Sequence, residues 1–148
     1  MSIAENKKAH FDYHILETLE AGLVLSGPEV KAVKKGEINL KGAYVSLAGT
    51  TSAFLVKAYI APYKPASTYQ RDYDPYQNRQ LLLKKKELKY LFGKSQEPGI
   101  TIIPLAIYKK GGLIKLSIGI ARGKKKFDKR ESIKKRDFER RKKSLVDN

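Results

Sequence analysis

Residues 99–121 read GITIIPLAIYKKGGLIKLSIGIA, and they predict the fold more clearly than any other stretch of the chain. In the second half, apolar residues recur at every other position, at Ile114, Leu116, Ile118 and Ile120. A period of two is typical of a strand that buries one face. The KKGG sequence at 109–112 supplies turn residues between the two apolar runs. We therefore expect a β-hairpin with arms at 99–108 and 113–121.

The sequence on the amino-terminal side of this hairpin predicts more strands. Apolar residues within 10–25 indicate a stretch that enters a sheet. Segments 43–47 and 52–60 flank the turn residues AGTT and predict a second hairpin. Residues 62–79 are rich in Tyr, Asp, Pro and Gln without a sustained period, and we expect them to form a long projecting loop.

Two short helices are also predicted. The first covers 28–35, because Pro28 suits a first helical turn and Gly36 follows as a stop. The second covers 81–92, where leucines fall near helical spacing and Gly93 lies just beyond.

Together these elements predict a mainly β fold. We expect a small closed OB-like β-barrel of about six strands with two or three short helices, because closure removes the sheet edges of so small a domain. An open sheet packed on helices is the alternative. The barrel is expected to span residues 1–121, with residues 1–9 mobile.

Residues 122–148, called the basic tail below, differ from the rest of the chain. They hold 13 Lys and Arg against 5 Asp and Glu, which is half of the net charge of +16. Their few apolar residues do not recur at steps of three and four, so no stripe is available for docking. An isolated helix of this length is marginal in water. We expect the basic tail to be disordered when free and helical when bound to RNA.

Several classes of function find no support in the sequence. No apolar run approaches the roughly 20 residues that span a bilayer, and residues 1–10 do not form a signal peptide. The chain has no Cys, so it has neither disulfides nor thiolate metal sites. We expect a cytoplasmic protein that acts at no membrane.

Catalysis and cofactor binding also lack a pattern. His10 and His14 are four residues apart, but no third His and no Cys complete a metal site. No glycine motif for binding nucleotide phosphates is present, and no pair of acids is spaced to share a site. The sequence therefore predicts no metal, no cofactor, no small-molecule substrate and no catalytic residues.

The remaining class is a protein that binds RNA. Lysine runs recur at 7–8, 34–35, 84–86 and 124–126, so positive charge is spread along the whole chain. Lys and Arg neutralise phosphates, and aromatic rings such as the tyrosines between 59 and 76 stack on unpaired bases. RNA is the partner that this composition favours.

The order of short motifs resembles one known family. The motifs are Asn6-Lys7-Lys8-Ala9, Glu20-Ala21-Gly22, Gly27-x-Glu29-Val30-Lys31, Asp74-Pro75 followed by Leu81-Leu82-Leu83, and the GKKxxDKR pattern at 123–130. In this order, and over almost the whole length, they closely resemble the bacterial SmpB family of SsrA-binding proteins.

The resemblance implies a function. It implies an OB-like barrel that binds the tRNA-like domain of transfer-messenger RNA and delivers that RNA to stalled ribosomes for trans-translation. The basic tail is implied to lie in the empty messenger channel and decoding centre of the small subunit, helical when bound. Alanyl-tRNA synthetase and elongation factor Tu are implied as indirect partners through the shared RNA. No enzymatic activity is implied.

Matched positions imply two sets of site residues. Those for the tRNA-like domain, with neighbouring lysines added on charge, are Asn6, Lys7, Lys8, Glu20, Lys31, Lys34, Arg79, Leu82, Lys84 and Lys86. Those for the function of the tail on the ribosome and its ribosomal RNA are Gly123, Lys124, Lys125, Asp128, Lys129, Arg130, Lys134, Lys135 and Arg136.

Three of these residues have a specific physical interpretation. Glu20 binds phosphate poorly, so it accepts hydrogen bonds from base or ribose groups or holds a Lys or Arg in place, with a plain salt bridge as the alternative. Gly123 is expected to provide backbone freedom where the barrel ends. Asp128 caps a helix that begins near Lys129, or else only balances charge.

The chain departs from the family after Asp74-Pro75, where Tyr76, Gln77 and Gln80 stand in a stretch that commonly carries more Arg and Lys in that family. Our hypothesis is that the lysines at 84–86 supply the missing interactions with phosphates. Two rival functions are a general RNA-binding or ribosomal-type protein, which composition alone favours, and an enzyme acting on RNA, which needs a catalytic site that the sequence lacks.

Overall fold

The computed structural model describes residues 2–63, 72–124 and 136. Its strands are β1 (Ser2–Glu5), β2 (Tyr13–Leu23), β3 (Ile38–Asn39), β4 (Tyr44–Ala48), β5 (Ser52–Val56), β6 (Tyr59–Ile60), β7 (Arg79–Leu82), β8 (Ile100–Lys110) and β9 (Leu113–Gly123). Its helices are α1 (Lys7–Asp12), α2 (Gly27–Lys34) and α3 (Lys85–Ser95). Within the described part of the chain, no helix is long and apolar enough to cross a membrane.

The hairpin of β8 and β9 forms the centre of the fold and confirms the prediction from residues 99–121. Its ladder runs from Ile100 opposite Arg122 to Lys110 opposite Leu113. Gly111 and Gly112 have φ of 58° and 80°, the positive values that a tight primed turn requires. The alternating apolar residues of β9 are buried in the core.

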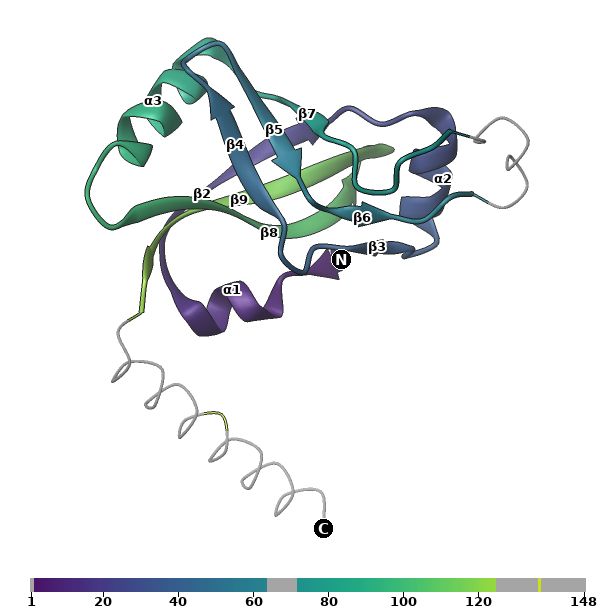
Figure 1. Ribbon diagram of the computed structural model, residues 1–148, viewed down its shortest axis with the longest axis horizontal. Coiled ribbons are helices and arrows are strands. Elements are labelled where there is room, and N and C mark those ends of the chain that lie inside the picture. The colour runs from purple at the N-terminus through teal and green to yellow at the C-terminus, as the bar shows by residue number, and fades with distance from the viewer. Residues whose placement is uncertain (1, 64–71, 125–135, 137–148) are drawn as a thin grey trace.

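Seven antiparallel strands form one sheet in the order β1-β8-β9-β2-β7-β5-β4, and β3 pairs with β6 in a separate ribbon. The large sheet folds over, so that β4 and β5 cross in front of β8, β9 and β2 (Figure 1). The main core fills the space between these layers, and Leu88 and Leu91 of α3 with Ala32 and Val33 of α2 are buried in it. The mainly β prediction is confirmed.

The predicted closed barrel is not found. The edges of the sheet are β1 and β4, and no ladder joins β4 to β8 in the described residues, although the two strands are in contact. The reason lies at β8, because β1 pairs with its outer edge at 106–108 and the Asn6 amide bonds to the Leu105 carbonyl. Only the first part of β8 faces β4, which leaves an open seam.

The amino-terminal residues differ from the expectation of a mobile segment over 1–9. Ser2–Glu5 pair with β8, and Lys7–Asp12 form α1 under a cap in which the Asn6 side chain accepts a bond from the Ala9 amide. Ile3 and Ala4 pack against the main core, which explains why this segment joins the fold. The sheet stretch predicted over 10–25 begins only at Tyr13.

The helix predicted over 81–92 is displaced toward the carboxyl terminus. Leu81 pairs with Ala53 of β5 and with Leu23 of β2, so β7 fills the gap between these two strands. The helix α3 starts only at Lys85. A short apolar run fits a strand or a helix equally well by period alone, and here the long-range pairing decides.

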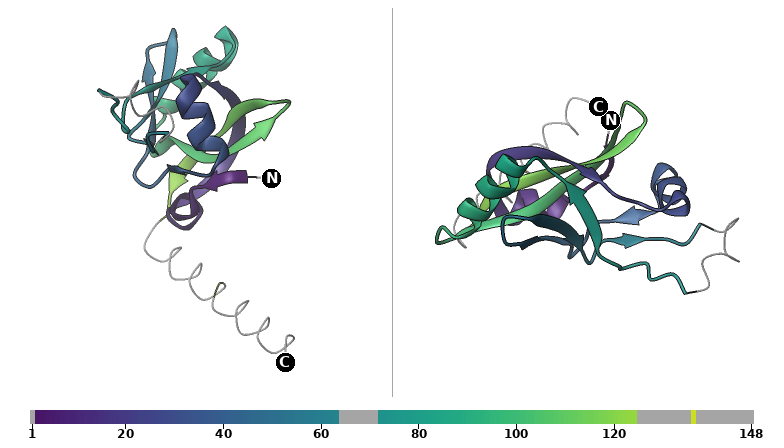
Figure 2. Two further views of the ribbon diagram at one scale, coloured as in Figure 1. Left: turned by 90° about the vertical axis from the view of Figure 1, so that its right-hand side faces the viewer. Right: turned by 90° about the horizontal axis from the view of Figure 1, so that it is seen from above.

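A second, smaller core lies under α1. It consists of Ala9, Ile103, Leu105 and Ala121, and Tyr13 and Ile15 pack against it. This cluster is separate from the main core. It packs α1 against β8 and the end of β9. Figures 1 and 2 show α1 lying beside these strands.

Candidate nucleic-acid interface

The outer face of β2, β7, β8 and β9 carries charged, apolar and aromatic side chains. Gly22 lies opposite Leu82 on one side and Lys115 on the other, and Lys115 in turn lies opposite Tyr108. Glu20 precedes Gly22 by two residues and therefore points to the same side of β2. The surface called the Glu20 face below consists of Glu20, Leu82, Tyr108, Lys110 and Lys115.

The carboxylate of Glu20 is held in place by its neighbours. The Tyr108 hydroxyl donates to Oε2, and the Lys110 ammonium lies 3.3 Å from the same oxygen. The Tyr108 hydrogen bond is the largest cause that lowers the pKa of Glu20, and Lys110 adds to it. Burial and the bond to Glu20 raise the pKa of Tyr108 to about 12, so the hydroxyl stays a donor. The expected salt bridge is therefore present.

The other carboxylate oxygen of Glu20 is available to a ligand. Within the described residues, Oε1 has no hydrogen-bond partner. A carboxylate oxygen accepts bonds from the amino and imino groups of bases and from ribose hydroxyls. The geometry gives Glu20 a fixed acceptor pointing out of a basic surface.

An apolar groove adjoins the Glu20 face at the tip of the central hairpin. It has a volume of about 310 Å³ and is lined by Gly22, Leu23, Val24, Leu25, Val30, Leu82, Gly112, Leu113, Ile114 and Lys115. Leu82 and Leu113, which are 58% and 61% exposed, both line this groove, so it presents apolar surface to solvent. A Cβ at Gly22 would lie 3.2 Å from the Leu82 Cβ, so the glycine leaves room for this leucine.

Lys84 and Lys86 lie close to Leu82 along the chain. Lys84 is the residue before α3, and its amide donates to the Glu87 carboxylate at 2.9 Å. The side chains of Lys84, Lys85 and Lys86 are all exposed. The structure thus places a basic run beside the apolar groove.

Lys31 and Lys34 lie elsewhere, on the exposed side of α2. The ammonium of Lys31 lies 5.5 Å from the centre of the Tyr63 ring, and that of Lys35 lies 5.0 Å from it. An aromatic ring with two cations is a second basic surface with a stacking face. The helix α2 covers Gly27–Lys34, one residue earlier at each end than the predicted range of 28–35.

Arg79 is not at the surface, contrary to the expectation that it contacts RNA. Only 2% of it is exposed, and its guanidinium pairs with the buried Glu29 carboxylate at 2.7 Å. It also donates to the carbonyls of Ala58 and Pro75 and to the Tyr73 hydroxyl. All of these bonds point inward, so Arg79 organises the chain around residues 73–79 rather than binding phosphate.

Glu29 completes this buried network. Its Oε2 also accepts bonds from Tyr73 and Gln77, and its Oε1 accepts from the Ser26 amide in a capping box. Burial alone would raise the pKa of Glu29, but the bonds from Ser26, Arg79 and Gln77 outweigh it and lower that pKa. The carboxylate is charged and fully engaged.

The three amino-terminal site residues fall into two groups. Lys7 and Lys8 are exposed on α1. The side-chain amide of Asn6 already has partners for both of its polar atoms. Its Oδ1 accepts a hydrogen bond from the Ala9 backbone amide, and its Nδ2 donates to the Pro104 carbonyl at 2.9 Å. Asn6 therefore holds α1 against β8.

The structure describes three of the predicted tail residues, Gly123, Lys124 and Arg136. Gly123 ends β9 without a positive φ and with open space around it, so the expected need for glycine backbone freedom is not seen. Lys124 and Arg136 contact α1. Lys125, Asp128, Lys129, Arg130, Lys134 and Lys135 lie outside the described residues.

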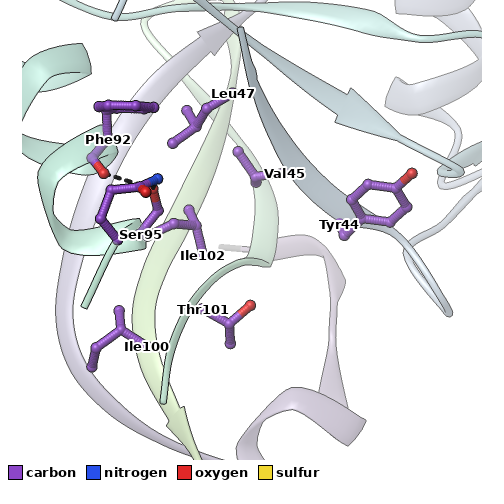
Figure 3. Close-up of a pocket in the computed structure, with 9 residues that line it drawn as sticks. Tyr44, Val45, Leu47, Phe92, Ser95, Ile100, Thr101 and Ile102 are labelled. Carbon is purple, nitrogen blue, oxygen red and sulfur yellow. Dashed lines mark hydrogen bonds between the residues drawn. The ribbon is translucent and has the colours of Figure 1, made fainter. Parts of the chain in front are cut away.

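The open seam between β4 and β8 contains a cleft of about 440 Å³. Figure 3 shows its apolar lining, with Val45, Leu47 and Ile102 from the two strands and Phe92 from α3, whose carbonyl accepts a bond from the Ser95 hydroxyl at 2.6 Å. None of the predicted site residues lines this cleft. Three or more possible metal ligands do not cluster in the part of the chain that is described.

Exposed lysines, a fixed carboxylate acceptor and exposed apolar and aromatic side chains on a curled antiparallel sheet define a small basic RNA-binding protein. A family model described as SmpB protein matches residues 3–148. The chain belongs to the SmpB family.

Relatives and one solved structure agree with this assignment. An SsrA-binding protein of Persephonella marina is 50% identical over 138 residues, which cover 93% of this chain and 89% of the relative. One from Burkholderia vietnamiensis is 48% identical over 146 residues, 99% and 97% of the two chains. A chain of the solved structure "tmRNA-SmpB: a journey to the center of the bacterial ribosome" is 40% identical, with a TM-score of 0.68, covering 88% of this chain and 93% of that chain.

Sequence reasoning missed part of the Glu20 face and its groove. Tyr108, Lys110 and Lys115 were assigned only to the predicted hairpin, and Val24 and Leu113 were not singled out. Their alternation with buried residues was visible, but their proximity to Glu20 depends on the register between β2 and β9.

Proposed function

We propose that this chain binds the tRNA-like domain of transfer-messenger RNA and delivers it to stalled ribosomes for trans-translation. The support is membership of the SmpB family, relatives named SsrA-binding proteins, and a similar solved structure whose name refers to tmRNA-SmpB and the bacterial ribosome. The observation that carries the proposal is the Glu20 face with its adjoining groove.

In this proposal, different parts of the Glu20 face have different tasks. Glu20 Oε1 accepts hydrogen bonds from a base edge or ribose, and Tyr108 and Lys110 keep it oriented. Leu82 and the groove contact unstacked bases or sugars, while Lys115 and the lysines at 84–86 meet phosphates. Such a surface reads RNA shape and a few base groups without catalysing a reaction.

The basic tail has a separate task in the proposal. Its Lys and Arg residues, which include Lys125, Lys129, Arg130, Lys134, Lys135 and Arg136, enter the empty messenger channel and contact ribosomal RNA near the decoding centre. A segment with 13 positive side chains gains affinity there by releasing counterions from the RNA.

Binding of the full chain to RNA tests the proposal. Fluorescence anisotropy at physiological salt compares a tRNA-like fragment of transfer-messenger RNA with an unrelated hairpin of equal length. We expect strong preference for the tRNA-like fragment. Equal affinity for both RNAs would instead favour the general RNA-binding function.

A matched pair of variants locates the contact. Glu20→Gln is expected to weaken binding of the tRNA-like fragment about tenfold, because the variant lacks the charged acceptor. Glu17→Gln is the control, because Glu17 is also an exposed carboxylate of β2 and accepts a hydrogen bond from the hydroxyl of Tyr90 in α3. Equal effects of both variants would count against the Glu20 face.

A further inference from the structure

We propose that the RNA interface continues from the apolar groove across α2 to Tyr63, where an unpaired base stacks on the ring and its phosphate binds Lys31 and Lys35. We call these three residues the Tyr63 cluster, and its ligand is a nucleotide of single-stranded RNA. Two observations carry the proposal, the convergence of two lysines on one ring and the place of α2 beside the groove. The proposal rests on the proposed function, because it adds a subsite to that RNA interface.

The ring of Tyr63 lies under two ammonium groups that come from the end of one helix. The Lys35 ammonium is 5.0 Å and the Lys31 ammonium 5.5 Å from the ring centre. Residues four apart on a helix stand on the same side of it, so α2 directs both side chains to the ring. Within the described residues, no other ring has two cations over it.

No acid neutralises the charge of this cluster. In the part of the chain that the structure describes, Lys31 and Lys35 form no salt bridge. On α3, by contrast, Lys94 lies 5.7 Å from the centre of the Tyr90 ring but also pairs with Glu97 at 3.5 Å. Like charges four residues apart on a helix repel each other. A phosphate that accepts bonds from both ammonium groups removes this repulsion.

The backbone that carries Tyr63 is fixed beside α2. The preceding strand β6 pairs with β3 and is in contact with α2, which lies next to it in Figure 1. The Ala61 amide donates to the Glu37 carbonyl at 3.0 Å, and the Ile60 carbonyl accepts a bond from the Tyr73 hydroxyl at 2.9 Å. The partly exposed ring is therefore placed before any ligand arrives, which lowers the ordering cost of stacking a base on it.

Helix α2 connects the Tyr63 cluster with the apolar groove. Val30 lines the groove, and Lys34 stands four residues later on the same side of the helix. Lys31 and Lys35 lie about 100° further round, since a turn contains about 3.6 residues. All three lysines are exposed. An RNA strand that leaves the groove thus meets Lys34 first and reaches Tyr63 by crossing a single helix.

The combination of ring and cations favours a nucleotide over an acidic peptide. Carboxylates need only the ammonium groups, whereas a nucleotide uses the cations and the ring together. The ammonium groups sit on flexible stems, so they turn from the ring to the phosphate while the base takes their place on the ring. The base must be unpaired, because a base inside a duplex is already stacked on both sides.

Tryptophan fluorescence tests the proposal on the full chain. The sequence has no Trp, so Tyr63→Trp introduces a single indole and keeps an aromatic ring at this position. We expect the tRNA-like fragment to quench its emission at least about twofold, because a base stacks on the ring. Tyr90→Trp is the matched control, and its emission should not change. Unchanged emission of the Tyr63→Trp variant at saturating RNA would overturn the inference.

Affinity measurements assign the parts of the cluster. Tyr63→Ala should weaken binding of the tRNA-like fragment about tenfold, whereas Tyr63→Phe should keep the parent affinity, since stacking needs the ring and not the hydroxyl. Lys31→Gln combined with Lys35→Gln should make the slope of log affinity against log salt shallower by about 0.7–0.9, the value for one phosphate. Tyr90→Ala combined with Lys94→Gln should bind as the parent does. Equal losses in this control and in Tyr63→Ala would overturn the inference.

A blunt RNA duplex of equal length distinguishes stacking from attraction by charge. The duplex should bind the Tyr63→Trp variant without quenching its emission, and equal quenching by duplex and fragment would contradict stacking. If the Tyr63 cluster takes an acidic protein instead, its variants leave every RNA titration unchanged, and the inference fails.

The same titrations separate this inference from the proposed function. If the parent chain does not prefer the tRNA-like fragment over an unrelated hairpin, the proposed function fails. Quenching of the Tyr63→Trp variant by the unpaired loop of that hairpin would still support the subsite. If the preference is present while the emission and the affinity of the Tyr63 variants stay at their parent values, the inference fails and the proposed function stands.

Discussion

The charged residues Glu29 and Arg79 stabilise the interior of the fold and do not lie at the surface. Both side chains are almost completely buried. Besides each other, the two groups bond to the Ser26 amide before α2, to the Ala58 carbonyl between β5 and β6, and to Tyr73, Pro75 and Gln77 before β7. Arginine in a basic chain is usually a surface residue. Its interior position follows from its pairing with the Glu29 carboxylate, and the sequence analysis named Glu29 only as part of the Gly27-x-Glu29-Val30-Lys31 motif.

Removing Arg79 should destabilise the protein strongly. We expect Arg79→Met to lower the free energy of unfolding by roughly 3–5 kcal/mol, because the Glu29 carboxylate would remain buried without its cation. Urea denaturation measures this. Lys94→Met is the control, since it breaks only the exposed pair with Glu97 and should cost about 0–1 kcal/mol. Similar small effects of both variants would contradict a structural role for Arg79.

The same pair predicts a dependence of stability on pH. The folded pKa of Glu29 is lowered from its ordinary value of 4.5, so its contribution is present above that value and disappears as the pH falls through the folded pKa. The parent should therefore lose stability in acid. Urea denaturation at a series of pH values should show the difference between parent and Arg79→Met shrinking as the pH falls below 4.5. A constant difference would mean that the ion pair contributes nothing.

At the scale of elements, the sequence predicts those helices and strands that depend on local patterns, and it misses those that depend on long-range pairing. The central hairpin and α2 were predictable because period-two alternation, paired glycines, a first-turn proline and a glycine stop are local signals. The strand β7 and the pairing of β1 with β8 depend on partners far away in sequence. The Glu20 face was predictable only in part, for the same reason. The motifs identified Glu20 and Leu82, but which residues lie beside them depends on the register of the strand pairing.

Two glycines should respond in opposite ways to alanine. Gly112→Ala is expected to destabilise by about 1 kcal/mol, because φ is +80° in the hairpin turn. Gly93→Ala should stabilise by about 0.5–1 kcal/mol, because this glycine lies within α3 with open space around it. Thermal or urea unfolding of both variants measures the difference. Destabilisation by both would show that α3 does not tolerate a side chain there.

The start of α3 should contribute to the salt dependence of RNA binding. Reversal of the lysines at 84–86 to Glu is expected to make the slope of log affinity against log salt shallower by about 1–3, or roughly 0.9 for each phosphate that is no longer neutralised. Titrations of the tRNA-like fragment at several salt concentrations give the slope. Reversal of the exposed Lys41, Lys57 and Lys89 is the control. An unchanged slope in the first variant would refute the hypothesis that these lysines replace basic residues after Asp74-Pro75.

At the scale of the whole molecule, the densest charge and the fixed polar and apolar groups belong to different parts of the chain. Half of the net charge of +16 belongs to the basic tail, whereas the fixed acceptor and the apolar groove belong to the sheet. Non-specific attraction follows charge, and discrimination between RNAs follows the placed polar and apolar groups. The open seam does not disturb this division, because it lies on a part of the molecule without the predicted site residues.

Removal of the tail after Lys124 tests this division. The shortened chain keeps β9 complete and lacks 11 Lys and Arg of the parent. We expect its preference for the tRNA-like fragment over an unrelated hairpin to persist, with a weaker dependence of affinity on salt. Anisotropy titrations of both RNAs at several salt concentrations measure this. Loss of the preference would assign discrimination to the tail.

The second core divides the buried apolar surface of the molecule into two unequal parts. Ala9, Ile103, Leu105 and Ala121 bury little apolar surface compared with the main core, so detachment of α1 costs less free energy than unfolding of the sheet. We therefore expect the backbone amides of α1 to exchange with solvent through a partial opening that leaves the rest of the sheet folded. In such an open state the Glu20 face would stay intact, because its residues lie on strands that pack on the main core.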